Sequence, residues 1–287
     1  MNLTGKAKLA GVMGWPVGHS RSPRLHGYWL EKYKIDGAYV PLSVRPEDLG
    51  VALTALPKLG FAGVNLTIPH KEAALALVAR VEETARLIGA VNTIVVEPDL
   101  SLTAWNTDVI GFEAALREGA PYLDTTGHAV VLGAGGAARA VLAALTNLGF
   151  WKIGIVNRTQ DRALALAKSL RRLGEVRGVV NWDCVDWEKR AKALEGATLL
   201  VNTTSLGMRG QPALDLDLSA LPKTAVVADI VYVPLETPLL TAARARGNSV
   251  VDGLGMLLHQ ARPGFKAWFG IDPAVTPALR AHVLGDG

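Results

Sequence analysis

Residues 128–140 read HAVVLGAGGAARA, and this stretch decides the fold of the second half of the chain. Residues 128–133 form a short apolar run typical of a buried strand, and residues 138–149 follow a helical pattern. The glycines between them match G-x-G-x-x-G/A, with Gly133, Gly135 and Ala138 at the three positions. Gly133 would permit the tight turn, Gly135 would let a pyrophosphate approach the backbone, and Ala138 would let helix and strand pack closely.

The helix that follows this loop would direct free backbone N–H groups and the positive end of its dipole at the phosphates. Glycines between a strand and a helix can also make an ordinary turn, but the context here favours dinucleotide binding. The stretch therefore predicts a Rossmann-type unit. The residues predicted to cradle the pyrophosphate are Gly133, Ala134, Gly135, Gly136 and Ala137.

The next predicted strand, 152–157, ends in residues that indicate which dinucleotide binds. Asn157, Arg158 and Thr159 stand there, and Arg162 follows four residues beyond Arg158. An NAD-binding unit usually has Asp or Glu at this place to hold the ribose 2′-hydroxyl, and an acid would repel a 2′-phosphate. Two guanidinium groups and a hydroxyl would instead hold that phosphate through charge-assisted hydrogen bonds. Two solvated arginines at a helix start are the alternative, but the pattern favours NADP over NAD.

Short β-branched runs alternate with amphipathic helical patterns along the rest of the chain. This alternation predicts an α/β protein built around parallel strands. We place a first domain at 1–107, completed by 254–287, and a Rossmann domain at 108–253. The other predicted strands are 9–15, 38–44, 62–68, 90–96, 102–106, 198–204, 224–232 and 249–253, and the clearest further helices are 108–118, 162–172, 256–270 and 277–284.

The composition is that of an ordinary globular protein, because 49% of the 287 residues are apolar and 20% are charged. The formal net charge is +4, but Lys and Arg are scattered, so no nucleic-acid partner is expected. No run reaches the ~18 uncharged apolar residues that a membrane helix needs. The single cysteine, Cys184, excludes an intrachain disulfide and favours a cytoplasmic protein. The six histidines are dispersed, so no metal site is expected.

Three polar clusters in or beside the first domain are candidates for the substrate site. Residues 19–22, HSRS, follow the first predicted strand, where hydroxyls and free helix N–H groups could receive a carboxylate. Residues 64–71, VNLTIPHK, place polar side chains at the end of another strand and the start of a helix. Asn92, Asn106 and Asp108 flank the predicted domain boundary.

Each cluster also has a plain structural interpretation. Ser22 could cap its helix, with Pro23 at the first helical position. Lys71 could be a surface lysine, and Asp108 could be one of the acidic residues that helix starts favour.

Nine stretches, in order along nearly the whole chain, together resemble the shikimate dehydrogenase family. They are GWPVGHSRSP (14–23), VNLTIPHK (64–71), GAVNT (89–93), NTDVIGF (106–112), LGAGGAARA (132–140), VNRTQDR (156–162), NTTSLGM (202–208), DIVYVPLETPLL (229–240) and DGLGMLLHQA (252–261). The resemblance implies an α/β substrate domain, completed by the C-terminal helices, beside a Rossmann NADP(H) domain.

Carried over motif by motif, the resemblance implies a set of site residues. The carboxylate of shikimate would be held by Ser20 and Ser22, with Tyr232 closing on the same side. The ring hydroxyls would be contacted by Thr67, Lys71, Asn92, Asp108 and Gln260. The adenosine 2′-phosphate end would be held by Asn157, Arg158, Thr159 and Arg162, and the nicotinamide pocket would be lined by Thr203, Met208, Ile230 and Gly253.

The implied reaction is the reversible reduction of 3-dehydroshikimate by NADPH, a step of chorismate and aromatic amino acid biosynthesis. We assign Lys71 as the proton donor, and as the acceptor in the reverse direction, with Asp108 as its partner. An ammonium must lose its proton before it can accept one, so shikimate oxidation is expected to be fastest at alkaline pH. Two departures from the family pattern, Val233 for a usual Asn and Thr203 for a common Ala, remove no group that this chemistry needs.

Two other functions stay open at this point. The first is a quinate/shikimate dehydrogenase with relaxed substrate or NAD use. Arg158 and Arg162 argue against NAD as its cofactor, but they say nothing about quinate as its substrate. The more distant one is a catalytically silent NADP-binding sensor, which would have no need of both Lys71 and Asp108. The sequence leaves a monomer and a homodimer equally open.

Overall fold

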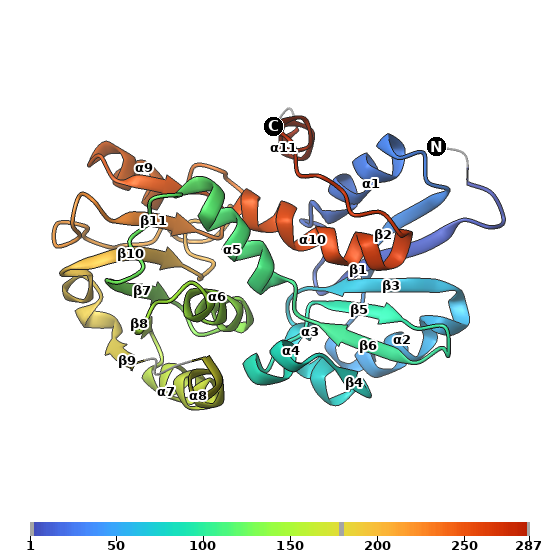
Figure 1. The fold of residues 1–287 in the computed structure, drawn as a ribbon, viewed down its shortest axis with the longest axis horizontal. Coiled ribbons are helices and arrows are strands. Elements are labelled where there is room, and N and C mark those ends of the chain that lie inside the picture. The colour runs from blue at the N-terminus through green and yellow to red at the C-terminus, as the bar shows by residue number, and fades with distance from the viewer. Residues whose placement is uncertain (1–2, 178–180, 286–287) are drawn as a thin grey trace. The chain divides into compact units, whose positions relative to one another are not determined.

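The computed structural model describes residues 3–177 and 181–285, and it divides into two compact units (Figure 1). Unit 1 runs up to Thr107 and resumes at Leu257, and unit 2 is Asp108–Met256. The sequence predicts that the chain returns to the first domain after residue 253. In the structure unit 2 extends to Met256, so the boundary lies inside one helix, α10 (Gly253–Phe269).

Unit 1 is built on a six-stranded sheet. Its strands are β1 (Lys8–Gly14), β2 (Gly37–Ser43), β3 (Phe61–Leu66), β4 (Arg80–Val81), β5 (Thr93–Val96) and β6 (Leu102–Trp105), in the order β2-β1-β3-β5-β6-β4. β1 pairs in parallel with β2 and β3, and β4 with β6. β5 runs antiparallel to β3 and β6. The sheet of unit 1 is therefore mixed, because the short link between β5 and β6 permits only a hairpin.

Helices cover both faces of this sheet. They are α1 (Ser22–Lys32), α2 (Leu49–Ala55), α3 (His70–Ala73), α4 (Glu83–Ile88), α10 and α11 (Pro277–Leu284), with single 3₁₀ turns at Pro46–Asp48, Pro57–Leu59 and Ala74–Ala76. One face buries aliphatic side chains such as Leu53 of α2 and Val64 of β3. The other face is aromatic, with Trp29 of α1 and Phe265 of α10 in edge contact at 5.2 Å between ring centres. The alternation of side chains along β3 divides these two cores.

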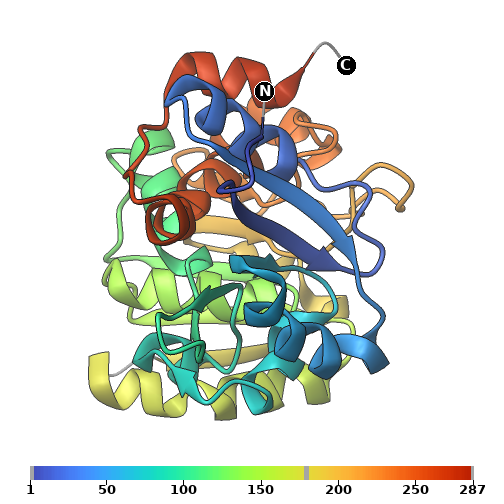
Figure 2. The same ribbon diagram turned by 90° about the vertical axis from the view of Figure 1, so that its right-hand side faces the viewer.

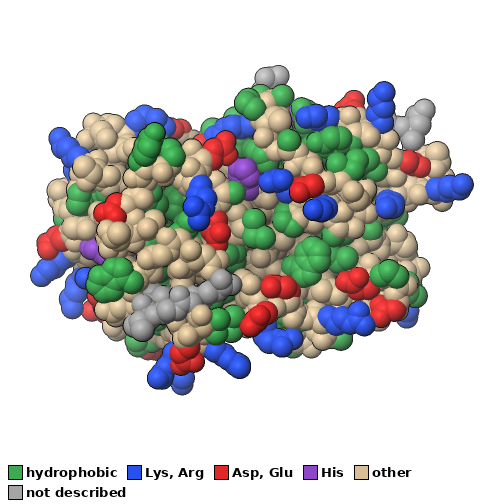
Figure 3. Space-filling view, in the orientation of Figure 1, with side chains coloured by type: hydrophobic (Ala, Val, Ile, Leu, Met, Phe, Trp, Pro, Cys, Tyr) green, Lys and Arg blue, Asp and Glu red, His purple; other side chains and the backbone are tan. Residues whose placement is uncertain are grey.

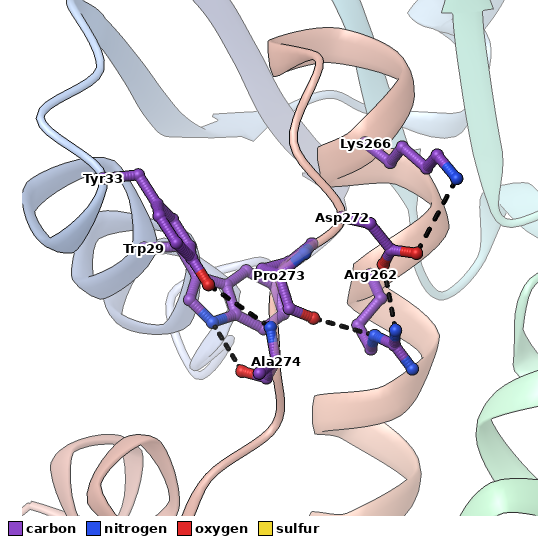
Figure 4. A network of polar contacts seen from close by, with 7 residues as sticks. All are labelled: Trp29, Tyr33, Arg262, Lys266, Asp272, Pro273 and Ala274. Carbon is purple, nitrogen blue, oxygen red and sulfur yellow. Dashed lines mark hydrogen bonds and ion pairs between the residues drawn. The ribbon is translucent and has the colours of Figure 1, made fainter.

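The chain after α10 is fastened back onto α1 by polar contacts (Figure 4). Arg262 donates from Nε to the Pro273 carbonyl at 2.8 Å and from Nη2 to Asp272 at 3.0 Å. The Trp29 indole donates to the Ala274 carbonyl at 3.3 Å. These contacts direct the chain into α11, which packs beside α1 (Figure 2). The C-terminal helices thereby complete unit 1.

Unit 2 is built on a second six-stranded sheet in which every pairing is parallel. Its strands are β7 (His128–Leu132), β8 (Lys152–Asn157), β9 (Asn181–Asp186), β10 (Ala197–Asn202), β11 (Val226–Asp229) and β12 (Ser249–Val251), in the order β12-β11-β10-β7-β8-β9. Numbered from β7, this is the strand order 3-2-1-4-5-6 of a dinucleotide-binding fold. The direction of winding reverses between β7 and β10, and ligands of such sheets bind at the carboxyl ends of the strands there.

The helices of unit 2 are α5 (Asp108–Gly119), α6 (Gly136–Asn147), α7 (Gln160–Ser169), α8 (Arg171–Arg177) and α9 (Pro238–Ala245), with 3₁₀ turns at Trp187–Lys189 and Lys192–Leu194. Buried residues of β7, β10 and β11 pack with α9 in one core, among them Leu132, Leu200 and Leu240. β9 was not predicted from the sequence. It lies at the edge of the sheet and is half-exposed along much of its length, so it lacks the apolar run of a buried strand.

No helix among residues 3–177 and 181–285 is long and apolar enough to cross a membrane. On the face drawn in Figure 3, Lys and Arg side chains alternate with Asp and Glu, and no broad area carries a single sign of charge.

Candidate functional site

The substrate residues expected in unit 1 lie at one edge of its sheet. β1 and β3 end at this edge, and β5 begins there, because Asn65 of β3 is paired with Thr93 of β5 in antiparallel register. Ser20 follows β1, Thr67 follows β3, and Asn92 directly precedes β5. The register therefore gathers three segments that are far apart in the sequence.

Ser20 and Ser22 lie at the start of α1. The helix begins at Ser22 with Arg21 in the N-cap position, so the interpretation of Ser22 as a capping residue is wrong. The Ser20 hydroxyl accepts a hydrogen bond from the Ser22 backbone N–H at 3.3 Å. Arg21 points its guanidinium to the carbonyl of Val283 in α11 at 3.3 Å. Arg21 gives α1 no side-chain cap, and the Ser20 hydroxyl is engaged with the helix only as an acceptor.

Thr67 is fixed against the end of β1. Its N–H donates to the Met13 carbonyl at 2.9 Å, and a Cβ added to Gly14 would lie 2.4 Å from the Thr67 methyl group. Only a glycine at position 14 admits the Thr67 side chain there, since real Cβ atoms do not approach so closely.

Lys71 stands on the short helix α3, which is held at both sides. The Lys71 carbonyl accepts from the Val91 N–H at 2.8 Å, which ties α3 to the segment that carries Asn92. The buried His70 ring places Nε2 at 2.8 Å from the Val44 carbonyl. Lys71 is therefore positioned beside Asn92 by backbone contacts, and its side chain is half-buried rather than fully exposed.

Asn92 and Gln260 meet in a buried polar cluster. The Asn92 amide nitrogen donates to Thr107 Oγ1 at 3.0 Å and to Gln260 Oε1 at 3.3 Å. Its amide oxygen accepts from the Thr107 N–H at 2.8 Å and from Thr93 Oγ1 at 3.0 Å. Asn92 is 2% exposed and Gln260 is 7% exposed. The side-chain amides of two residues 168 positions apart are thus joined in one hydrogen-bonded group.

A second chain of hydrogen bonds leads from this cluster to Ser22. Asn65 donates to Thr93 Oγ1 at 3.1 Å and accepts from the Tyr39 hydroxyl at 2.6 Å. The Ser22 hydroxyl in turn bonds to the Tyr39 phenol, and this bond opposes the burial that raises the pKa of Tyr39 well above its usual range. Tyr39, Thr93 and Thr107 were not singled out from the sequence. The available signal was a polar residue inside an otherwise apolar strand, as at Asn65.

Asp108 is the first residue of α5. It follows Thr107, whose backbone N–H donates to the Asn92 amide oxygen. Its side chain is 4% exposed. Asp108 therefore stands at a helix start, where an acidic residue is also compatible with the purely structural interpretation given above.

The loop after β7 in unit 2 fits the phosphates of a dinucleotide. Gly133 has a φ of +109°, which favours glycine, and a Cβ there would lie 2.6 Å from Thr203 Oγ1. Gly135 has an extended backbone, and a Cβ there would meet no protein atom within 4 Å. Gly135 is also the N-cap of α6 and offers no side-chain cap. The protein itself gives no reason for a glycine at 135, whereas a ligand lying close to the backbone does.

The expected 2′-phosphate residues stand at the end of β8, next to β7. The Asn157 amide donates to the Thr159 carbonyl at 2.8 Å and so fixes the turn into α7. Arg158, Thr159 and Arg162 are exposed. Within the described part of the chain, neither guanidinium pairs with a carboxylate, so both are available to an anion.

The nicotinamide residues expected from the sequence follow β10 and β11. The Thr203 hydroxyl donates to the Leu132 carbonyl at 2.6 Å, which joins the ends of β10 and β7 at the point where the winding reverses. A Cβ on Gly253 would lie 2.2 Å from the Ile230 carbonyl oxygen, so only glycine fits and the two residues are in contact. Met208 is half-buried in the loop after β10, and Tyr232 is half-buried two residues beyond Ile230.

The last residues of β10 and β11, Asn202 and Asp229, were not predicted as site residues. Both are buried, and Asn202 donates to Asp229 at 3.0 Å. Burial raises the pKa of Asp229 to about 6 against the opposing effect of its hydrogen bonds. The signal that could have identified them is the polar residue that closes each apolar strand. Among the described residues no cluster of three or more His, Cys, Asp or Glu could hold a metal ion.

Comparisons with known proteins agree with this arrangement. Residues 12–94 match the shikimate dehydrogenase substrate binding domain, 121–181 the shikimate/quinate 5-dehydrogenase family, and 253–281 the shikimate 5′-dehydrogenase C-terminal domain. The chain is 59% identical over 283 residues to the shikimate dehydrogenase (NADP(+)) of Paramagnetospirillum magneticum, covering 98% of this chain and 100% of the relative.

Two solved structures are similar along nearly their whole length. The structure of shikimate 5-dehydrogenase from Thermus thermophilus in complex with NADP(H) and shikimate has a TM-score of 0.83 and 38% identity, covering 96% of this chain and 98% of that one. The structure of quinate dehydrogenase from Corynebacterium glutamicum in complex with NAD has a TM-score of 0.89 and 35% identity, covering 97% of this chain and 99% of that one.

Proposed function

This chain belongs to the shikimate dehydrogenase family, and from that premise we propose which of its residues bind the substrate, hold the cofactor and move the proton. The chain is an NADP-dependent oxidoreductase that interconverts 3-dehydroshikimate and shikimate in the biosynthesis of aromatic compounds. The observation that carries the residue assignment is the hydrogen-bonded chain in unit 1 from Ser22 through Tyr39 and Asn65 to Asn92 and Gln260.

Unit 1 supplies most of the proposed substrate contacts. Ser20 and Ser22 hold the carboxylate through their hydroxyls, which stand together at the start of α1, near the positive end of the helix dipole. Thr67 and Gln260 bond the ring hydroxyls from the same sheet edge. Asn92, whose amide is fully bonded within unit 1, reaches a ring hydroxyl by exchanging its bond to Gln260 for one to the ring. Tyr232, half-buried in the loop after β11, is proposed for the carboxylate on the resemblance of its motif alone.

We propose Lys71 as the group that gives a proton to the carbonyl oxygen as it becomes a hydroxyl. Its ammonium also stabilises the negative charge that develops on that oxygen, an effect on the order of 3 kcal/mol for one well-placed donor. Asp108 is the proposed partner that contacts a ring hydroxyl and orients the lysine. In the oxidation of shikimate the same amine accepts the proton, so it must first be deprotonated.

The proposed cofactor residues bind in two ways, some through backbone N–H groups and others through charged side chains. Gly133 to Ala137 present the N–H groups of the α6 start to the pyrophosphate, and Arg158 and Arg162, with Asn157 and Thr159, hold the 2′-phosphate. Thr203, Met208, Ile230 and Gly253 line the nicotinamide pocket. When bound, NADPH supplies the hydride for the reduction.

The assignment is tested by following shikimate oxidation through the absorbance of the reduced nicotinamide, with NADP and NAD, in the wild type and in Lys71→Ala. We expect NADP-dependent turnover that falls on the order of 10³-fold in the variant, the usual effect of removing a positioned acid or base. Lys58→Ala is the matched control, because Lys58 is an exposed lysine of the same unit. A Lys71→Ala enzyme that keeps wild-type turnover would exclude Lys71 as the proton donor.

Quinate is a second candidate substrate, favoured by the similarity to the NAD-bound quinate dehydrogenase. The same assay with quinate in place of shikimate measures the preference directly. The exposed, unpaired Arg158 and Arg162 support NADP over NAD as the cofactor for either substrate.

We also propose the cytoplasm as the compartment of this enzyme. The chain has one cysteine, Cys184, as is usual where thiols stay reduced.

A further inference from the structure

Two buried polar side chains close the central strands of unit 2, and the roles assigned above use neither of them. Asn202 is the last residue of β10 and Asp229 the last of β11, and the two are register partners in the parallel pair. Their exposed fractions are 0% and 2%. Both stand at the carboxyl edge of the sheet, beside the point where the winding reverses.

Asn202 uses its whole hydrogen-bonding capacity within the protein. Its amide nitrogen donates to Asp229 Oδ1 at 3.0 Å and to the Leu206 carbonyl at 3.2 Å. Its amide oxygen accepts from the Thr204 N–H at 3.0 Å and from the Thr204 hydroxyl at 2.7 Å. An asparagine side chain can donate twice and accept twice, so this residue is saturated and fixes one path for the loop after β10.

Asp229 does the same for the loop after β11. Oδ1 also accepts from the Val231 N–H at 3.0 Å, and Oδ2 accepts from the Thr237 hydroxyl at 2.8 Å. Thr237 is the N-cap of α9 and accepts from the Leu240 N–H at 3.3 Å. The carboxylate therefore connects the strand, the following loop and the start of the next helix.

The two loops are also joined directly by their backbones. The Ile230 N–H donates to the Asn202 carbonyl at 3.1 Å, and the Arg209 N–H donates to the Val233 carbonyl at 2.8 Å. These loops carry Thr203, Met208 and Ile230, the proposed nicotinamide residues. A buried carboxylate with a raised pKa is weak evidence for a stabilising role, since apolar residues of similar volume often serve stability better.

We propose that Asn202 and Asp229 are positioning residues for the nicotinamide end of the cofactor site, which hold the loops after β10 and β11 in one conformation before NADP(H) binds. The inference rests on the proposed cofactor site. A positioned loop orients the ring for hydride transfer, and small errors in such an orientation reduce the rate strongly. The adenosine end, at the end of β8, is formed by other residues and does not depend on this pair.

The test separates the two ends of the cofactor with a probe that has only one of them. Adenosine 2′,5′-bisphosphate carries the 2′-phosphate but no nicotinamide. For Asn202→Ala and Asp229→Ala we expect kcat/KM for NADP to fall about 10-fold or more, from the lost orientation. The dissociation constant of the bisphosphate, measured by calorimetry, stays at its wild-type value. Asp229→Asn, which keeps the shape and the acceptor for Asn202 and Val231, recovers part of the loss.

Asp217→Asn is the matched control. Asp217 also bonds the N–H and hydroxyl of a residue in the same unit, here Ser219 at 2.8 Å and 2.7 Å, but on the surface. Equal weakening of NADP and bisphosphate binding in the Ala variants would show a merely structural role and overturn the proposal. If an Ala variant does not fold, Thr237→Val removes only the Thr237 hydroxyl, which bonds Asp229 and caps α9. Wild-type kinetics in both Thr237→Val and Asp229→Asn would also overturn it. A wild-type protein that binds no bisphosphate would contradict the proposed cofactor site instead.

Discussion

The polar edge of unit 1 and the adenosine end of unit 2 are built in opposite ways. In unit 1, Ser22, Asn92 and Gln260 are joined through buried side chains, and each hydroxyl or amide has its direction set by a neighbour. In unit 2, Arg158 and Arg162 are exposed and unpaired within the described residues. A ring with several hydroxyls requires donors and acceptors in fixed directions, whereas a phosphate is attracted by charge from many directions. Variants of the first region should therefore affect folding and binding together, and variants of the second should affect binding alone.

The largest effect is expected where the buried cluster is broken. Asn92→Ala leaves the Thr107 N–H and the Thr93 hydroxyl without the acceptor they now share, and it removes a donor to Gln260. We expect a loss on the order of 4 kcal/mol in the free energy of unfolding, from two or more unsatisfied buried groups. Urea unfolding measures it, and a raised KM for shikimate should accompany it. An unchanged unfolding curve with a raised KM would mean that unit 1 is not organised in this way.

Asp229 belongs to unit 2, but it is buried and hydrogen-bonded like the polar groups of unit 1. Its pKa is about 6 in the folded protein against 3.8 as the ordinary value, so the native state holds the extra proton between these values. The stability from this group is present below about pH 4 and is lost as the pH rises through 6, in total about 3 kcal/mol at most.

Urea unfolding of the wild type and Asp229→Asn across pH 4 to 7 measures this contribution as a difference. The variant should lack the decrease between pH 4 and 6. The surface residues Asp99, Asp124 and Asp217, whose pKa values their hydrogen bonds lower, are common to both proteins and cancel. Parallel curves for the two proteins would mean that Asp229 titrates normally.

The double variant Arg158→Ala/Arg162→Ala tests the opposite side of the comparison. We expect KM for NADP to rise about 30-fold, or about 2 kcal/mol, from the loss of two charge-assisted contacts. KM for NAD and the melting temperature should remain at the wild-type values, because the guanidiniums contact no carboxylate in the described chain. Arg171→Ala, which removes another exposed arginine of unit 2, serves as the control.

The smallest effect is expected for Tyr39→Phe. The ring keeps its stacking on His26, at 3.9 Å between ring centres, while the hydroxyl between Ser22 and Asn65 is removed. We expect a loss of about 1.5 kcal/mol in unfolding free energy, from the two hydrogen bonds that the hydroxyl makes. KM for shikimate should rise by a few fold as Ser22 loses its partner. A KM equal to that of the wild type would show that Ser22 is positioned without Tyr39.

Sequence reasoning was most successful where one short stretch sets both the backbone and the chemistry. Residues 128–140 predicted a strand, a glycine turn and a helix start, and β7, Gly133 and α6 are found there. β9 escaped prediction because an edge strand does not need an apolar run. The antiparallel β5 was placed as a strand but not given its direction, which depends on its partners β3 and β6.

The site divides in the same manner. The residues assigned by motif, such as Thr67 just after β3 and Lys71 in α3, lie in short stretches that the sequence itself marks. Tyr39 could not be located in this way, since its value lies in a contact with Asn65, 26 positions away, that only the register of the sheet creates. Asp229 was hidden for a related reason, because it lies inside the predicted strand 224–232 and its buried partners come from other parts of the chain.

The uncapped start of α6 has a consequence for the life of this protein in the cell. With Gly135 at the N-cap, the first turn of that helix lacks the side-chain acceptor that most helices provide. At the proposed cofactor site a bound phosphate would supply the missing acceptor, and the folded state would gain stability with the NADP(H) concentration, about 2.7 kcal/mol at a hundred times Kd. The dinucleotide pool then acts on abundance as well as on turnover. Depletion of that pool would expose the empty protein to degradation before any change in its synthesis.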